Sequence, residues 1–264
     1  MSDLGPSMTR LECPTEVELS VVIPALNESN RLPPTLARIT RFLDTHPDWQ
    51  PAEIIVVDDG SSDGTAASVS AADIPPNIVL RVEQHPRNFG KGAAVKTGFS
   101  LSTGHWVLLT DADLSAPIEE LSVLARAASR GCIAIGSRAI ARRLVENPQP
   151  RHRDFMGRTF NHMLQALRLT EITDTQCGFK LFPGDLARAL ATVQRLDGFA
   201  FDVELLLLAK HWGFAAKEVG VRWSHIEASR VMAVRHSIEM FGEMLRLWWW
   251  KIRGTLDSRP VELR

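Results

Sequence analysis

The sequence has few cysteines, no long apolar run and no excess of charge of one sign. Cys13, Cys132 and Cys177 lie far apart and lack metal-ligand spacing, which argues against zinc and a disulfide framework and favours a reducing compartment. No run approaches the roughly 20 apolar residues that a membrane-spanning helix needs, and the polar N-terminus does not resemble a signal peptide. A net charge of −1 creates no global field that would attract nucleic acid. We therefore expect a cytosolic protein, or one bound to a membrane only at its surface.

Apolar runs alternate with helical segments along most of the chain. Runs that predict buried strands occupy residues 19–23, 53–57, 78–82, 105–110, 132–136, 179–182 and 216–223. Segments with helical spacing occupy residues 32–42, 92–102, 118–129, 155–167, 199–212 and 231–253. This alternation predicts an α/β, Rossmann-like fold, with a mostly parallel sheet, helices on both faces and ligands at the carboxyl ends of the strands.

The chain fits one large domain. No internal repeat or low-complexity linker divides its 264 residues, and this length is sufficient to bury a substantial core. We expect a flexible N-terminus at residues 1–16, the main domain at residues 17–227, and a C-terminal amphipathic helix with a tail at residues 228–264.

Two carboxylates follow the predicted strand at residues 105–110. Asp111 and Asp113 lie on either side of Ala112, at the carboxyl end of that strand. Mg²⁺ favours one or two carboxylates together with phosphate oxygens, so the pair suits a divalent cation and, through it, a diphosphate. A solvated turn or a helix cap would give the same pattern, and the surrounding motifs have to decide between these interpretations.

Polar residues also end the first two predicted strands. Pro24 removes a ladder donor and turns the chain, which leaves Asn27 and Glu28 at the rim of the sheet. Asp58 and Asp59 end the second strand at the equivalent level, where a carboxylate can accept from a base imide or a ribose hydroxyl. A helix N-terminus explains the first group equally well, and plain capping explains the second.

A glycine-containing stretch, Arg87 to Gly92, opens the helix expected at residues 92–102. Glycines before a helix N-terminus let backbone N–H groups reach a phosphate, and Lys91 adds positive charge. The stretch is neither a Walker A loop nor a complete dinucleotide fingerprint, which argues against both of those nucleotide-binding classes.

Six arginines fall within a short segment that contains only two acidic residues. They are Arg138, Arg142, Arg143, Arg151, Arg153 and Arg158. A solvated charged face is the usual explanation, yet arginine in preference to lysine suits forked recognition of phosphate. Because the chain is otherwise balanced in charge, we expect a second anion site here.

Seven short blocks stand out in order along the chain. They are Val-Ile-Pro-Ala-Leu-Asn-Glu at 22–28, Val-Asp-Asp-Gly-Ser at 57–61, Asn-Phe-Gly-Lys-Gly at 88–92, Thr-Asp-Ala-Asp-Leu-Ser at 110–115, Gly-Ser-Arg at 136–138, Asp-Thr-Gln-Cys-Gly-Phe-Lys at 174–180 and Phe-Ala-Phe-Asp-Val-Glu at 199–204. In this order they resemble the inverting GT-A glycosyltransferases of family 2. The likeness extends over residues 18–227 and is strongest to the polyprenyl- and dolichyl-phosphate glycosyltransferases, especially the dolichyl-phosphate β-glucosyltransferase branch.

The resemblance implies a UDP-sugar donor, expected to be UDP-glucose, a polyprenyl phosphate acceptor, and Mg²⁺ or Mn²⁺ held by Asp113 and Asp111. It places catalysis at Asp111, Asp113, Asp174 and Arg138. It places the acceptor phosphate at Arg138, Arg153 and Arg158. Residues expected around the nucleotide sugar are Pro24, Ala25, Asn27, Glu28, Asp58, Asp59, Lys91, Asp111, Ala112, Asp113 and Gln176.

Several roles remain open at this level. Asp174 would orient the sugar or the acceptor phosphate, or act as a base, and a turn cap is the plain alternative. Asp202 and Glu204 interrupt an apolar helix, and a structural ion pair, with Lys180 or Lys217, explains them as well as a functional role does. A GDP-mannose donor and a non-lipid acceptor are alternatives within the family. Outside it, Asp-x-Asp-x-Ser also resembles the nucleophile motif of haloacid-dehalogenase-type phosphatases, and a non-catalytic membrane-surface module is a third class.

The C-terminal helical segment carries an apolar stripe. The stripe runs through Val234, Ile238, Phe241, Leu245 and Trp248. Tryptophans 248–250 stand among Arg246, Lys251 and Arg253, a composition suited to a lipid headgroup boundary. Eukaryotic glucosyltransferases of this type begin with a membrane-spanning helix that has no counterpart in this sequence. We therefore expect the C-terminal helix to attach the protein to the cytoplasmic face of a membrane, and burial of the stripe in a homo-oligomer is the alternative.

Overall fold

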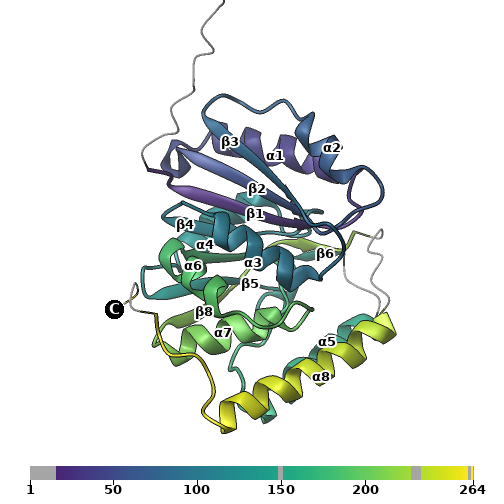
Figure 1. Cartoon of the computed structure of the whole chain (residues 1–264), viewed down its shortest axis with the longest axis vertical. Helices are drawn as coiled ribbons and strands as arrows, with labels where there is room; N and C mark the ends of the chain where they lie inside the picture. Colours follow the sequence, from purple (N-terminus) through teal and green to yellow (C-terminus); the bar gives the residue numbers. More distant parts are fainter. Residues whose placement is uncertain (1–15, 148–150, 227–232, 261–262, 264) are drawn as a thin grey trace, which may run out of the picture.

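The computed structural model describes residues 16–147, 151–226, 233–260 and 263, with side chains throughout these ranges except at 151–155 and 233–238. Within them, seven strands form one sheet in the order β3-β2-β1-β4-β7-β5-β8 (Figure 1). The strands are β1 (Leu19–Ala25), β2 (Ala52–Asp58), β3 (Ile78–Gln84), β4 (Trp106–Leu109), β5 (Cys132–Ser137), β7 (Lys180–Pro183) and β8 (Ala215–Gly220). All neighbours are parallel except β7, which runs antiparallel between β4 and β5.

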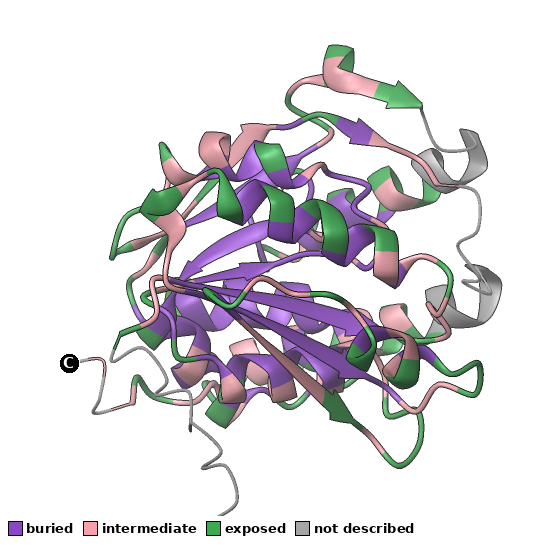
Figure 2. Cartoon of the chain, turned by 90° about the horizontal axis from the view of Figure 1, so that it is seen from above, coloured by how far each residue is buried: buried purple, intermediate pink, exposed green. Residues whose placement is uncertain are grey.

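Helices cover both faces of this sheet, and the strands between them are largely buried (Figure 2). One face carries α1 (Leu32–Asp44), α2 (Thr65–Ser70) and α4 (Leu121–Ala125), and the other carries α3 (Lys91–Leu101), α6 (Gly184–Val193) and α7 (Phe201–His211). Val21 belongs to the first core layer and Val22 to the second, because successive side chains of a strand point to opposite faces. The predicted α/β fold is confirmed.

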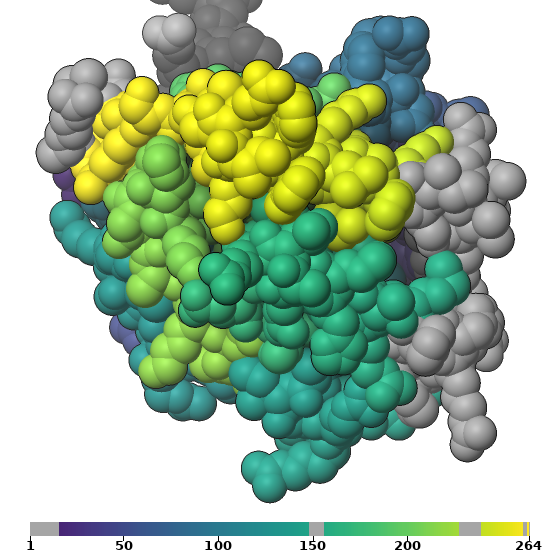
Figure 3. Space-filling view, turned by 90° about the horizontal axis from the view of Figure 1, so that it is seen from below, coloured from purple at the N-terminus to yellow at the C-terminus, as the bar shows by residue number. Residues whose placement is uncertain are grey.

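Two further helices, α5 (Arg151–Ala166) and α8 (Ala233–Ile252), lie side by side on one face of the molecule (Figures 1 and 3). They share a third apolar cluster with α7. Its buried members include Phe160 and Leu164 of α5, Val203 and Leu207 of α7, and Met244 and Leu247 of α8. The inner face of α8 is therefore part of the core. No helix within the described ranges is long and apolar enough to cross a membrane.

The expected elements differ from the observed ones in a few places. The helix expected at residues 118–129 is a single-turn 3₁₀ helix (Ile118–Glu120) followed by the short α4. The last strand ends at Gly220, and a separate two-stranded sheet pairs β6 (Val145–Asn147) with β9 (Trp223–Ser224). Helix α6 was not predicted. Two short 3₁₀ helices, Pro47–Trp49 and Arg142–Leu144, complete the described elements. Residues 1–15 and 227–232 lie outside the described ranges.

Candidate active site

Several predicted blocks meet at the carboxyl edge of the sheet, because β1 pairs with β2 on one side and with β4 on the other. Ala25 lies opposite Asp58 in the β1–β2 register, and the segment that leaves β4 lies next to the turn after β1. Burial raises the pKa of Glu28 in that turn against the pull of Arg31, and the negative charge of Asp113 adds to the rise. The blocks that follow β1, β2 and β4 thus form one site.

Asp111 is held between a cation and a glycine. Lys91 Nζ donates to Asp111 Oδ1 at 2.6 Å, and Asp111 Oδ2 lies against Gly178, where a Cβ would come within 2.1 Å of it. Burial alone would raise the pKa of Asp111, but the positive charges of Lys91, Lys180 and Arg138 together outweigh burial and keep the pKa below its ordinary value. Asp111 is therefore an ionised carboxylate with a fixed position.

Asp113 has a different electrostatic environment. Its Oδ1 accepts from the Ser115 N–H at 2.9 Å, and no cationic side chain within the described ranges forms an ion pair with it. Burial, and then the charge of Asp111, raise the pKa of Asp113 above its ordinary value. A cation bound between the two carboxylates would relieve this repulsion.

The pair fits a divalent metal that takes its other ligands from elsewhere. In the described part of the chain, no group of three or more His, Cys, Asp or Glu residues could hold a metal ion by itself. Mg²⁺ usually takes one or two carboxylates and completes its shell with waters and substrate phosphates. The oxygens of Asp111 and Asp113 therefore suit a cation that binds together with a diphosphate.

The turns after β1 and β2 are bonded to each other. Asn27 has a positive φ of 56°, donates its N–H to Ser61 Oγ at 2.8 Å and accepts from the Ser62 N–H at 3.0 Å. Asp58 is fully buried, and its carboxylate accepts from the Ser61 N–H at 3.0 Å and from Gln84 Nε2 at 3.1 Å. Asp58 thus caps its turn, which was the plain alternative. Contact of Asn27 and Asp58 with a nucleoside stays a prediction.

Three of the residues expected around the nucleotide sugar have buried side chains. Pro24 and Ala25 end β1, and Ala112 separates the two carboxylates. A ligand could reach these residues only through their main chain. Their assignment to the nucleotide site stays a prediction.

Asp59 braces the loop that precedes α3. Its Oδ1 lies 2.7 Å from His85 Nδ1 and accepts from the Phe89 N–H at 3.0 Å, and its Oδ2 accepts from the Gly90 N–H at 2.8 Å. This support could not be predicted from local sequence, because the partners of Asp59 lie 26 to 31 residues away. A contact of Asp59 with the nucleotide sugar stays a prediction.

The N–H groups around the start of α3 are used within the protein, which corrects the expectation that they bind a phosphate. The N–H groups of Gly92 and Ala93 both donate to the Asp197 carbonyl, at 2.8 and 3.3 Å, and the Gly90 N–H is bonded as described above. The loop before α7 thus takes the position that we had assigned to a phosphate. This stretch contributes the Lys91 side chain to the site instead.

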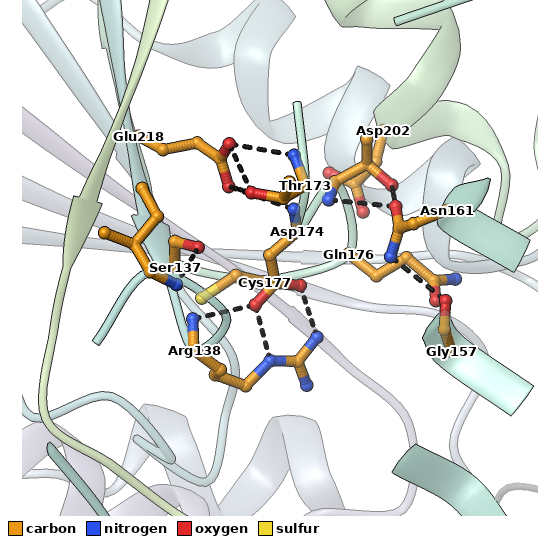
Figure 4. Close-up of polar contacts among 12 residues, drawn as sticks. Ser137, Arg138, Gly157, Asn161, Thr173, Asp174, Gln176, Cys177, Asp202 and Glu218 are labelled. Carbon is orange, nitrogen blue, oxygen red and sulfur yellow. Dashed lines mark hydrogen bonds and ion pairs between the residues drawn. The ribbon is translucent and has the colours of Figure 1, made fainter. Parts of the chain in front are cut away.

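Arg138 and Asp174 form a two-pronged ion pair (Figure 4). Arg138 Nε and one terminal nitrogen donate to the Asp174 oxygens at 2.8 and 2.6 Å, and the Arg138 N–H adds a third bond at 2.8 Å. Glu218 holds Asp174 from behind by accepting from its N–H at 3.0 Å. Burial would raise the pKa of Asp174, but Arg138 outweighs it and lowers the pKa. A carboxylate held ionised in this way is a weak base, which favours a positioning role for Asp174.

The other arginines assigned to the acceptor phosphate belong to α5. Arg158 has an exposed side chain, whereas the Arg153 side chain lies outside the described residues. Helix α5 is bonded to the 174–180 block, because Asn161 Oδ1 accepts from Thr175 Oγ1 at 2.8 Å. Gln176 Nε2 instead lies 3.7 Å from Met240 Sδ of α8. The roles of Arg153, Arg158 and Gln176 stay predictions.

A buried ion pair lies behind Asp111. Lys180 Nζ is 2.5 Å from Asp202 Oδ1 and donates to the Cys177 carbonyl at 2.7 Å, and the Lys180 and Asp202 side chains are almost completely buried. The structural ion pair considered for Asp202 is thus confirmed, with Lys180 as its partner. Glu204 has a different task, since it accepts from the main-chain N–H groups of residues 195 and 196 at 2.9 and 2.8 Å.

Solved structures share the fold of this chain. A glucosyl-3-phosphoglycerate synthase from Mycobacterium tuberculosis, in complex with Mn²⁺, UDP-glucose and phosphoglyceric acid, superimposes with a TM-score of 0.64 at 21% identity, covering 94% of this chain and 86% of that one. A mannosyl-3-phosphoglycerate synthase from Rubrobacter xylanophilus gives a TM-score of 0.63 at 20% identity, covering 92% of this chain and 77% of the other. At these identities the likeness establishes the fold alone.

Relatives of higher identity match nearly the whole chain. A dolichyl-phosphate beta-glucosyltransferase of Trichomonas vaginalis is 35% identical over 244 residues, covering 89% of this chain and 72% of the relative. The Dictyostelium discoideum and Homo sapiens proteins of that name are 33% and 31% identical, covering 94% and 89% of this chain and 81% and 75% of their own lengths. The profile described as Glycosyl transferase family 2 matches residues 20–190. The chain therefore belongs to glycosyl transferase family 2.

Proposed function

We propose that this protein transfers glucose from UDP-glucose to a dolichyl-type polyprenyl phosphate with inversion, which yields a lipid-linked monophosphosugar. One observation carries the proposal: the carboxylate pair and an arginine adjoin each other at one edge of the sheet. The positive charges of Lys91 and Arg138 both lower the pKa of Asp111. A metal-diphosphate site and an arginine suited to a second phosphate are therefore neighbours. The names of the relatives at 31–35% identity support this choice of donor sugar and acceptor.

On the donor side, Asp113 and Asp111 would hold Mg²⁺ or Mn²⁺. A bound divalent metal neutralises the charge that develops on the departing nucleoside diphosphate. Lys91 keeps Asp111 ionised and fixed, so that carboxylate needs little rearrangement when the donor binds. The turns that carry Glu28 and Asp58 lie next to the pair and would face the nucleoside. Both metals suit these oxygens.

On the acceptor side, the protein has to position a nucleophile more than to create one. A phosphate monoester has a second pKa near ~6, so it is largely a dianion at neutral pH and needs no strong base. This matches Asp174, which is held ionised by Arg138. Arg138, together with Arg153 and Arg158, would hold the phosphate in line with the anomeric carbon. A phosphate oxygen then attacks the anomeric carbon from the face opposite the diphosphate. The bond between that carbon and the diphosphate breaks, and its electron pair leaves with UDP. Because attack and departure occur on opposite faces, the configuration inverts.

Helix α8 supplies a surface suited to a membrane, in keeping with a lipid acceptor. Four large apolar side chains of α8 are exposed to the extent of 43% to 54%: Phe241, Leu245, Trp249 and Ile252. The Arg253 guanidinium stacks over Trp249 at 4.1 Å, an aromatic and cationic combination typical of headgroup boundaries. We place this outer face of α8 on the anionic cytoplasmic surface of a membrane. Trp248 packs on the third apolar cluster instead, so Trp249 takes the place that we expected for Trp248.

The proposal is tested with the purified full chain, Mn²⁺ or Mg²⁺, and labelled UDP-glucose or GDP-mannose. Polyprenyl phosphate serves as the lipid acceptor, and phosphoglyceric acid, which the neighbouring synthase structure contains, serves as the non-lipid acceptor. We expect label from UDP-glucose in an organic-soluble, acid-labile product that requires the metal. Label in a water-soluble product alone would overturn the lipid acceptor. Transfer from GDP-mannose alone would overturn the donor.

A further inference from the structure

One carboxylate of α8 supports the loop between α6 and α7. Glu243 Oε2 accepts from the Ala200 N–H at 3.1 Å. Gly198 lies so close that a Cβ there would come within 2.3 Å of Glu243 Oε1. Burial raises the pKa of Glu243, while the N–H groups of Ala200 and Gly198 act against the rise. The loop is thus fitted to this carboxylate at two residues, Gly198 and Ala200.

The same loop holds the beginning of α3. The Asp197 carbonyl accepts from two N–H groups in the first turn of that helix, those of Gly92 at 2.8 Å and Ala93 at 3.3 Å. Gly90 has a φ of +117°, and a Cβ there would lie 2.3 Å from the Asp197 oxygen; a Cβ on Gly92 would lie 2.5 Å from the Leu196 oxygen. Main chain therefore contacts main chain at these two glycines, and Gln194 Nε2 ties the loop to the helix further by donating to the carbonyls of Gly92 and Leu196 at 2.8 and 2.9 Å.

Lys91 stands between these two glycines, and its Nζ reaches Asp111 Oδ1 at 2.6 Å. We propose that Glu243 is a positioning residue for transfer: by fixing the 197–200 loop it sets the place of Lys91 against Asp111. The inference rests on the proposed function, because it presumes that Asp111 belongs to the metal-diphosphate site. The path from α8 to the carboxyl edge of the sheet consists of three hydrogen bonds, Glu243–Ala200, Asp197–Gly92 and Lys91–Asp111.

A role confined to docking α8 fits the contacts less well. The helix is already anchored by Met244 and Leu247, which are buried in the third apolar cluster, and Met240 contacts Gln176. Removing the Glu243 carboxylate should therefore leave α8 in place. What loses its partner is the pair of N–H groups at Gly198 and Ala200, so the loop is the element that moves.

The test compares Glu243→Ala and Glu243→Gln with Met244→Ala, a control that weakens α8 packing but keeps the carboxylate. Misplacing a catalytic group by about 1 Å can cost about 100-fold, so we expect Glu243→Ala to lower kcat roughly 10- to 100-fold with little change in the acceptor KM. Mn²⁺-dependent UDP binding, measured by calorimetry, should weaken with it. Glu243→Gln keeps one acceptor oxygen and should recover part of both. Met244→Ala should lower the thermal midpoint while keeping kcat.

A double-mutant cycle with Lys91→Ala identifies the route. If Glu243 acts through Lys91, Glu243→Ala should have little further effect on kcat in the Lys91→Ala background. Fully additive effects, or unchanged kcat and UDP binding in Glu243→Ala, would overturn the inference. If Glu243→Ala does not fold, the cycle with Glu243→Gln decides in the same way. Failure of the wild-type protein to bind UDP with Mn²⁺ would instead overturn the proposed function.

Discussion

Gly178 leaves the space that the Asp111 carboxylate fills, since a Cβ on Gly178 would come within 2.1 Å of Asp111 Oδ2. We predict that Gly178→Ala displaces Asp111 from Lys91 and lowers turnover by about 100-fold, with the fold retained. Turnover and circular dichroism should be measured together. Gly157→Ala is the matched control, because nothing lies within 4 Å of the added Cβ there. Near-normal turnover of Gly178→Ala would show that this contact does not fix the carboxylate.

Asp113→Ala should abolish transfer and leave the fold intact. Asp113 is bonded only locally, to Ser115, whose N–H donates to it at 2.9 Å, so the core loses little, whereas a metal ligand is worth orders of magnitude in rate. The measurement is turnover at saturating Mg²⁺ or Mn²⁺ beside Mn²⁺-dependent UDP binding. Asp44→Ala, an exposed carboxylate at the end of α1, is the control. Normal activity with excess metal would remove Asp113 from the metal site.

Arg138→Ala and Arg153→Ala should impair use of the lipid phosphate far more than binding of UDP-glucose. Each removes a charge-assisted contact worth ~1.5–3 kcal/mol, which corresponds to roughly 10- to 150-fold in kcat/KM for the acceptor. Arg138 also neutralises buried Asp174, so Asp174→Asn is needed as a companion to separate loss of the phosphate contact from loss of this ion pair. A collapse of donor affinity with unchanged acceptor kinetics would mean that the two anion sites are exchanged.

The pairing of Asp174 with Arg138 predicts a dependence of stability on pH. Although burial opposes it, Arg138 lowers the pKa of Asp174 in the folded state, below the unfolded value of about 3.9. The contribution of this group is therefore present above the unfolded pKa and is lost as pH falls through the folded pKa. Asp174→Asn should be less stable than the wild type at neutral pH, and the difference should shrink in acid. Urea unfolding across pH measures it, and a difference that is constant with pH would contradict the assignment.

Removing one partner of the Lys180–Asp202 pair should destabilise the fold more than removing both. The two atoms are 2.5 Å apart and both side chains are buried, and an uncompensated buried charge costs about 3–5 kcal/mol. We expect Lys180→Met and Asp202→Asn each to lower the free energy of unfolding strongly, and the double variant to recover part of the loss. Denaturant unfolding tests this. If the loss of unfolding free energy in the double variant equalled the sum of the two single losses, the two charges would not compensate each other.

The strands and the carboxylate pair could be predicted because their signals are local. Buried runs such as 53–57 are continuous in sequence, and Asp111 and Asp113 follow a strand whose carboxyl end must lie at the ligand edge. The bonds from the N–H groups at the start of α3 to another loop could not be predicted. The Asp197 carbonyl that accepts from Gly92 lies more than 100 residues further along the chain. Only the packing of α3 against the 197–200 loop brings the two together.

The phase of the α8 stripe could not be predicted for a related reason. Helical spacing marks the apolar positions but not the neighbour that covers them. Trp248 and Met244 pack toward α5 and α7, whereas Phe241, Leu245 and Trp249 remain exposed. When a helix has apolar residues on more than one side, tertiary packing decides which side is buried.

The exposed face of α8 should attach the protein to a membrane. Replacing Phe241, Leu245, Trp249 and Ile252 together by serine removes the apolar side chains that are 43% to 54% exposed and leaves Met244 and Leu247 in the core. Burial of such side chains in a bilayer interface contributes on the order of 1 kcal/mol or more each, so co-sedimentation with phosphatidylserine-containing liposomes should fall by at least about tenfold. UDP-glucose binding should be unchanged.

The matched control and a second measurement separate the membrane from a homodimer as the occupant of this face. Trp248 packs against the core, so Trp248→Phe should keep liposome binding although it changes a tryptophan of the same helix. Light scattering then reports the oligomeric state of each variant. If the four serine substitutions left co-sedimentation unchanged and converted a dimer to a monomer, the exposed face of α8 would be a subunit interface. If they released the protein from liposomes without changing its mass in solution, the same face would be the membrane contact, because only apolar burial in the bilayer would have been lost.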